Sequence, residues 1–169
     1  MSQPAGPTPS RSAAASLDQQ HDKRAESQIG SQTEFRSTPA AGGVLGIGTD
    51  IIECERIERM LAKHGDVFLV RVYTAREIDY CSHRKAGVQH YAGRWAAKEA
   101  VLKSIGTGWA HGIQWTDVEV VNQQGGKPNI VLAGKAKEIS EQLGIREIMI
   151  SISHCRSHAV AYATALGGA

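Results

Sequence analysis

The chain has 169 residues, of which 41% are hydrophobic and 21% charged, with a formal net charge of +2. This length and hydrophobic content fit one domain that can bury a core, while so small a net charge does not indicate a nucleic-acid binder. No run of about 20 apolar residues that could span a membrane is present. We therefore expect a soluble cytoplasmic protein that binds neither nucleic acid nor membrane.

The composition changes near Gly42. Residues 1–42 are rich in Ser, Gln, Ala, Pro and Gly and contain few large apolar residues, so we expect a disordered tail there. The alternative, a targeting peptide, fits less well because four acidic residues balance four basic ones in this segment. Residues 43–169 are the expected folded domain. Its three cysteines, Cys54, Cys81 and Cys155, lack metal-type spacing and are expected to be reduced.

The domain alternates strand and helix patterns. Periodicity, capping residues and glycines predict strands over 44–52, 66–73, 117–122, 129–133, 147–153 and 159–166, and helices over 55–65, 74–83, 90–105 and 135–144. Thr74 and Glu77 have the spacing of a capping box. The sum predicts an α+β domain with mostly antiparallel pairing and one long helix.

The long helix carries the block "GRWAAKEAVLKSIGTG", residues 93–108. Ala92, Ala96, Glu99 and Lys103 form one stripe at helical spacing, whose small residues we interpret as room for a ligand. An exposed Glu99–Lys103 ion pair is the simpler alternative. The Gly-Thr-Gly ending could present backbone N–H groups to phosphate oxygens, although a helix cap would explain one glycine.

Two further blocks carry candidate functional residues. In "GIGTDIIECERI", Asp50 is either the N-cap of the next helix or a metal ligand, and a dinucleotide fingerprint is rejected because the third glycine is missing. In "SISHCRSH", His154 ends a strand and is either structural or catalytic. A zinc site of His154, Cys155 and His158 would have poor geometry in so short a loop.

Together these blocks resemble the holo-acyl-carrier-protein synthases, the small phosphopantetheinyl transferases. The family pattern G-x-D-x-x-x-x-x-R-I appears as "GTDIIECERI", R-[FW]-A-x-K-E-A-x-x-K-[AS]-x-G-T-G as "RWAAKEAVLKSIGTG", and S-[IL]-S-H as "SISH". The resemblance spans residues 44–165. It implies the phosphopantetheinyl transferase fold, usually as a homotrimer with each active site at a subunit boundary.

The resemblance also implies roles for individual residues. Asp50 and Glu99 would hold Mg²⁺, which suits two carboxylates beside a pyrophosphate. Arg94 would contact the 3'-phosphate of coenzyme A, Lys103, Gly106 and Thr107 its other phosphates, and His154 would lie near the coenzyme. Glu99, Lys103 and His154 are the expected catalytic residues. The carrier-protein contacts would be Arg56, Met60 and Arg71.

The implied reaction moves the phosphopantetheine arm of coenzyme A to a serine of apo acyl carrier protein, releases adenosine 3',5'-bisphosphate and serves fatty acid biosynthesis. Glu99, or a water held by the metal, is the preferred acceptor of the serine proton, and His154 is the alternative. The chain departs from the family pattern at "KHGDVF", where relatives can carry another arginine, and at Cys155, where some have an acidic residue. A carrier-binding module without catalysis and a metal-dependent pyrophosphate hydrolase are the competing functions.

Overall fold

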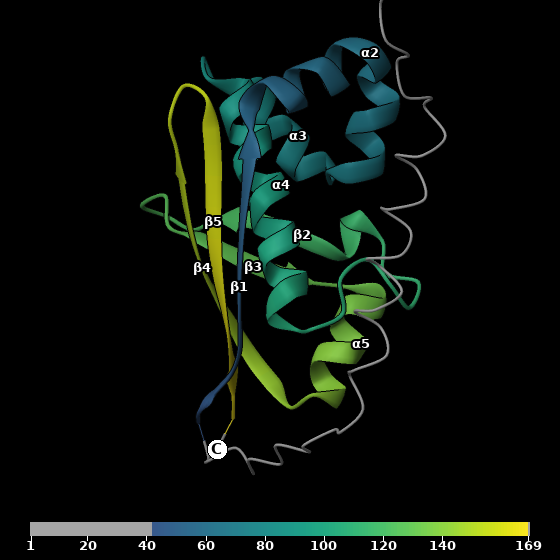
Figure 1. The fold of residues 1–169 in the computed structure, drawn as a ribbon, viewed down its shortest axis with the longest axis vertical. Helices are drawn as coiled ribbons and strands as arrows, with labels where there is room; N and C mark the ends of the chain where they lie inside the picture. The colour runs from purple at the N-terminus through teal and green to yellow at the C-terminus, as the bar shows by residue number, and fades with distance from the viewer. Residues whose placement is uncertain (1–41, 169) are drawn as a thin grey trace, which may run out of the picture. The chain divides into compact units, whose positions relative to one another are not determined.

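The computed structural model describes residues 42–168 (Figure 1). Its elements are β1 (Val44–Glu53), α2 (Cys54–Val72), α3 (Ala75–Ser82), α4 (Gly87–Ser104), the 3-10 turn η2 (Trp115–Asp117), β2 (Val118–Asn122), β3 (Pro128–Leu132), α5 (Gly134–Gln142), β4 (Ile145–His154) and β5 (His158–Gly167). The expected tail lies outside the described residues, apart from Gly42, so its disorder stays a prediction. Within the part that is described, every helix is too short or too polar to cross a membrane.

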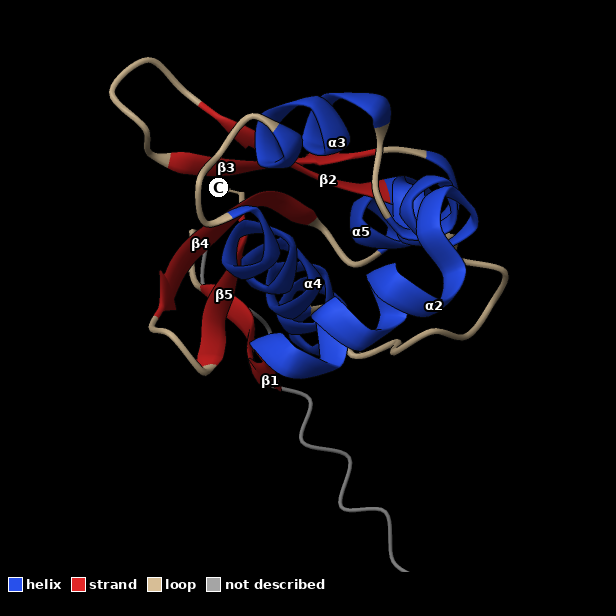
Figure 2. Ribbon diagram, turned by 90° about the horizontal axis from the view of Figure 1, so that it is seen from above, coloured by secondary structure: helices blue, strands red, loops and turns tan. Residues whose placement is uncertain are grey.

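The strands form two antiparallel units. β1, β5 and β4 make a three-stranded sheet in that spatial order, and β2 pairs with β3 in a separate hairpin. Alternate residues of β5 are buried, as expected for a strand with one face against the core. α4 runs along this buried face, and α2 contacts α4 from another side (Figure 2). The predicted α+β class with mostly antiparallel pairing is confirmed.

β1 approaches α4 so closely that two of its residues have to be glycine. A Cβ atom at Gly46 would lie 2.0 Å from the carbonyl oxygen of Ser104, and a Cβ atom at Gly48 would lie 2.0 Å from that of Ala100. Neither atom could be accommodated without moving strand and helix apart, because both neighbours are main chain. The two glycines that resemble a dinucleotide fingerprint therefore serve helix–strand packing.

Small residues also line α4 and β5. Ala92 and Ala96 of α4 are fully buried, and so is Ala163 of β5. The interpretation that the alanines at 92 and 96 make room for a ligand is wrong, because the protein itself covers them. Their physical reason is close packing inside the core.

α2 continues where the sequence predicts a strand. Residues 66–72 are helical, and the predicted strand over 66–73 is wrong. Gly65 interrupts the helix with φ 50° and ψ −131°, after which the chain resumes helical geometry. Phe68 and Val72, four residues apart, are buried on one face of this second half. Local β-propensity of the valines is thus overridden by tertiary packing.

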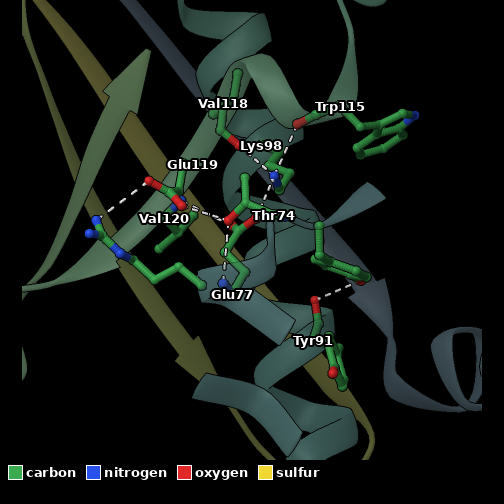
Figure 3. A network of polar contacts seen from close by, with 10 residues as sticks. Thr74, Glu77, Tyr91, Lys98, Trp115, Val118, Glu119 and Val120 are labelled. Atoms are coloured by element: carbon green, nitrogen blue, oxygen red, sulfur yellow. Dashed lines mark hydrogen bonds and ion pairs between the residues drawn. The ribbon is translucent and has the colours of Figure 1, made fainter. Parts of the chain in front are cut away.

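A carboxylate lies at the centre of the packing between α3, α4 and β2 (Figure 3). Thr74 and Glu77 form the predicted capping box, in which the Thr74 N–H donates to Glu77 Oε2 over 2.9 Å. Glu77 is fully buried, and its Oε1 accepts a bond of 3.0 Å from the Val120 N–H. The same residue that caps α3 therefore also holds β2.

The cation that balances this carboxylate is Lys98 of α4. Its Nζ lies 2.8 Å from Glu77 Oε2, and both side chains are fully buried. Lys98 also donates to the carbonyl oxygens of Trp115, over 3.0 Å, and of Val118. Burial lowers the pKa of Lys98 below its ordinary value, and the Glu77 carboxylate offsets part of this effect. All three protons of the ammonium group thus have acceptors, as a buried charge requires.

Replacing Lys98 by Met should destabilise the fold strongly, because Glu77 would stay buried without its cation. We expect the free energy of unfolding to fall by about 3–5 kcal/mol, measured by urea denaturation at a fixed protein concentration. Lys135→Met is the matched control, because it removes only a solvent-exposed ion pair with Glu138. That change should cost less than about 1 kcal/mol. Equal losses for the two variants would contradict a special role for the buried pair.

Candidate active site

Asp50 and Lys103 meet where β1 crosses α4. Lys103 Nζ lies 2.8 Å from Asp50 Oδ1 and donates a second bond of 2.9 Å to the carbonyl oxygen of Thr49. Glu53, rather than Asp50, occupies the N-cap position of α2, so the N-cap interpretation of Asp50 is wrong. The Asp50 carboxylate is mostly buried and lies beside a lysine one turn from Glu99.

Glu99 is half-buried on α4 and does not form the simple ion pair with Lys103. Its Oε1 instead accepts a hydrogen bond of 2.7 Å from the indole Nε1 of Trp109. Trp109 stacks on Trp115 with ring centres 3.6 Å apart, and Trp115 packs on Trp95 at 4.1 Å. Trp109 was not among the predicted site residues; its only signal in the sequence is an aromatic residue directly after the Gly-Thr-Gly ending.

The Gly-Thr-Gly ending closes α4 with a Schellman motif. Gly106, at φ 75°, donates its N–H to the carbonyl oxygen of Lys103 over 3.1 Å, and the Thr107 N–H donates to that of Leu102 over 3.2 Å. The expectation that these two backbone N–H groups are free for phosphate is therefore wrong, because the helix end uses them. The Thr107 hydroxyl is different: its Oγ1 is buried without a hydrogen-bond partner among the described residues.

Arg94 is buried on α4, and its Nη2 donates 2.8 Å to Asn122 Oδ1. Its guanidinium lies 4.0 Å from the centre of the Tyr80 ring. Nε of Arg94 is the second buried side-chain atom in residues 42–168 that has no hydrogen-bond partner. Arg94, Tyr80 and Asn122 line a cavity of about 440 Å³, to which Arg76 adds a second cation.

His154 ends β4 at an exposed position, next to α4. Its ring contacts the edge of His90 with centres 5.3 Å apart, and His90 in turn contacts Tyr80 at 5.6 Å. Burial lowers the pKa of His90, and the nearby His154 and Arg94 lower it further. Across the described residues, no three His, Cys, Asp or Glu side chains gather as a metal cluster.

The sequence and the fold match one family. The model of the 4'-phosphopantetheinyl transferase superfamily matches residues 46–163. The chain belongs to this superfamily. It is 49% identical over 118 residues to the holo-[acyl-carrier-protein] synthase of Ruminiclostridium cellulolyticum, an alignment that covers 69% of this chain and 88% of the relative. Its activity is that of a holo-[acyl-carrier-protein] synthase, which transfers the phosphopantetheine arm of coenzyme A to apo acyl carrier protein.

Solved structures of such synthases share the fold. A holo-acyl-carrier-protein synthase of Plasmodium yoelii is 32% identical with a TM-score of 0.67, and the match covers 77% of this chain and 100% of that one. A synthase of Bacillus anthracis, described as a complex with coenzyme A (3',5'-ADP), is 35% identical with a TM-score of 0.62. This match covers 76% of the present chain and 100% of the Bacillus chain. The predicted phosphopantetheinyl transferase fold is confirmed.

The transferase presents a mixed basic and apolar surface on α2. Arg56 and Arg71 are exposed, Met60 is partly buried, and the Arg56 guanidinium lies 5.8 Å from the centre of the Trp95 ring. Beside Arg71, the side chains of Val67 and Val70 are 73% and 65% exposed. These valines were not among the predicted contacts.

Gly48→Ala should impair catalysis through geometry, because the added Cβ would push β1 from α4 and move Asp50 away from Lys103. We expect the transfer rate at saturating substrates to fall about 100-fold, the effect of a misplacement of about 1 Å, and stability to fall by about 1–3 kcal/mol. Thr49→Ser is the control, because this neighbour keeps its hydroxyl and its carbonyl bond to Lys103. A normal rate for Gly48→Ala would show that strand–helix spacing does not set the site.

Proposed function

We propose that this transferase acts in fatty acid biosynthesis in the cytoplasm, and that Asp50 and Glu99 hold the Mg²⁺ ion that its reaction needs. The observation that carries the proposal is the packing of β1 on α4, by which Asp50 meets Lys103 one helical turn from Glu99. A carboxylate bonded to a lysine, with a second carboxylate one helical turn away on α4, is suited to a metal-bound pyrophosphate.

The chemistry of the two carboxylates fits magnesium. Both are hard oxygen ligands, and Mg²⁺ is usually bound by one or two carboxylates together with substrate phosphates. In the described residues each carboxylate accepts hydrogen bonds through one oxygen, Oδ1 of Asp50 and Oε1 of Glu99. The second oxygen of each side chain is the proposed ligand. When bound, the ion would neutralise charge on the pyrophosphate and orient it.

The residues around Asp50 and Glu99 are proposed to bind different phosphates of coenzyme A. Lys103 pairs with Asp50 over 2.8 Å and would neutralise the charge that develops on the departing phosphate. The hydroxyl of Thr107, rather than its backbone N–H, is the proposed donor to the phosphates, and Gly106 contributes by shaping the turn. Arg94, with an unpartnered Nε beside a cavity, is the proposed contact of the 3'-phosphate.

The serine hydroxyl of the carrier has to lose a proton as its oxygen attacks phosphorus. Glu99, or a water held by the metal, is the proposed acceptor, because Glu99 is half-buried and has a single neutral donor in the described residues. His154 is the second candidate, because it is exposed at the end of β4 and its ring is held by His90.

We place the active site at a subunit boundary of a homotrimer. The face of the three-stranded sheet that points away from α4 is apolar and exposed, and a second copy of the chain is the proposed cover. Its exposed apolar side chains include Ile47, Ile51, Met149, Val160 and Tyr162. His154 lies at the end of this sheet, where a neighbouring subunit would place its coenzyme.

The carrier protein would dock on α2. Carrier proteins are acidic, and Arg56 and Arg71 are exposed cations on this helix. Met60 supplies an apolar contact, and Val67 and Val70 extend it beside Arg71. An acidic surface with an apolar patch is therefore the proposed complement.

One assay tests the reaction and the metal site. We incubate the protein with coenzyme A, Mg²⁺ and apo carrier protein, follow the intact mass of the carrier, and compare Asp50→Asn and Glu99→Gln with the unchanged chain. Each variant should lose at least about 100-fold in rate, since even an outer-shell partner is worth 10–100-fold. Glu138→Gln, an exposed carboxylate on α5, is the control.

The outcomes of this assay separate the competing functions. Cleavage of coenzyme A without a change in carrier mass would indicate a hydrolase, and no reaction at all would indicate a binding module. Near-normal turnover of Glu99→Gln at limiting Mg²⁺ would remove Glu99 from the metal site.

Arg56→Glu should raise the apparent KM for acyl carrier protein strongly while the KM for coenzyme A changes little. Charge reversal replaces attraction by repulsion, so its effect should exceed that of Arg56→Ala and shrink as salt is added. Lys137→Glu on α5 is the matched control for charge reversal elsewhere on the surface. An equal, salt-insensitive loss for both substrates would mean that Arg56 supports Trp95 rather than docking the carrier.

A further inference from the structure

The indole of Trp109 is the one side chain in the described residues that donates a hydrogen bond to Glu99. The bond joins Nε1 to Oε1 over 2.7 Å and bridges from α4 to the loop that follows it. A donor bonded to an ionised carboxylate makes a short, strong hydrogen bond. The Trp109 N–H is a donor only, so in this bond the Glu99 carboxylate is the acceptor.

A column of aromatic rings holds this indole in place. Trp109 stacks on Trp115 at 3.6 Å with ring planes 30° apart, and Trp115 packs on Trp95 of α4 at 4.1 Å. Trp95 in turn stacks on Phe68 of α2 at 6.0 Å. η2 is itself tied to the core, because the Trp115 carbonyl oxygen accepts from the buried Lys98. The direction of the Trp109 N–H is therefore set by packing between several elements.

We propose that Trp109 is a positioning residue for Glu99, an inference that rests on the proposed metal role of this carboxylate. Its N–H occupies Oε1 and turns the carboxylate so that Oε2 remains for the divalent cation. Hydrogen bonds of this outer kind orient the ligands of many metal sites. A neutral donor orients the carboxylate without adding a second positive charge to that of Lys103, which already pairs with Asp50.

The variant Trp109→Phe separates the hydrogen bond from the stack, since phenylalanine keeps an aromatic ring and lacks the N–H. The direct readout is binding of Mn²⁺ alone, a hard divalent cation, followed by the electron paramagnetic resonance of the free ion. We expect the dissociation constant to rise about 10-fold, at the lower end of the usual loss for an outer-shell partner. The Mg²⁺ concentration for half-maximal transfer should rise in parallel.

Two further variants make the experiment decisive. Trp115→Phe alters the same aromatic column without removing the hydrogen bond to Glu99. Its Mn²⁺ affinity should stay within about two-fold of that of the unchanged chain, which is less than the loss expected when a residue that hydrogen-bonds a metal ligand is removed. Trp109→Phe should add nothing in a Glu99→Gln background, because its effect is expected to act through that carboxylate.

Each result has a defined reading. Unchanged Mn²⁺ affinity in Trp109→Phe, together with weakened binding in Glu99→Gln, would overturn the role of Trp109 and leave the metal site standing. Equal losses in Trp109→Phe and Trp115→Phe would also overturn it, since the stack rather than the hydrogen bond would then matter. Unchanged affinity in Glu99→Gln would overturn the metal role of Glu99 and this inference with it.

Discussion

The short separation between β1 and α4 governs the geometry of the site. Gly46 and Gly48 allow the strand to touch the backbone of the helix, because neither has a Cβ to hold the two apart. Two residues beyond Gly48 on the same face of the strand, Asp50 meets Lys103. A packing requirement in the core thereby brings the mostly buried Asp50 carboxylate to Lys103, so the stability of this region and the geometry of the proposed site share one cause.

Lys98 and Glu99 are consecutive residues of α4 that lie in different surroundings. Lys98 points into the core and is neutralised by Glu77, whereas Glu99, about 100° further round the helix, reaches a half-buried position and accepts a bond from Trp109. Both oxygens of Glu77 accept hydrogen bonds, but Glu99 uses one oxygen only in the described residues. A carboxylate whose two oxygens both accept hydrogen bonds from the protein has a structural role. A carboxylate with one oxygen left over can still accept a bond from a ligand.

Much of the fold and part of the site could be predicted. Strong periodicity located the strands and the long helix, and the Thr74 capping box was correct. The error over residues 66–73 arose because valine-rich segments favour strands locally, while Phe68 and Val72 are held in a helix by packing. Lys98 and Trp109 were missed because a lysine or tryptophan in a sequence carries no sign of its partner.

The sequence by itself determined the family and the transferase activity, since ordered motifs record the identities and spacings of residues that relatives share. Only the tertiary structure decided which atoms are available. It joined Lys103 to Asp50 and the indole of Trp109 to Glu99. These hydrogen bonds join residues that are separated in the sequence. Their partners are therefore decided only when strand, helix and loop pack against one another.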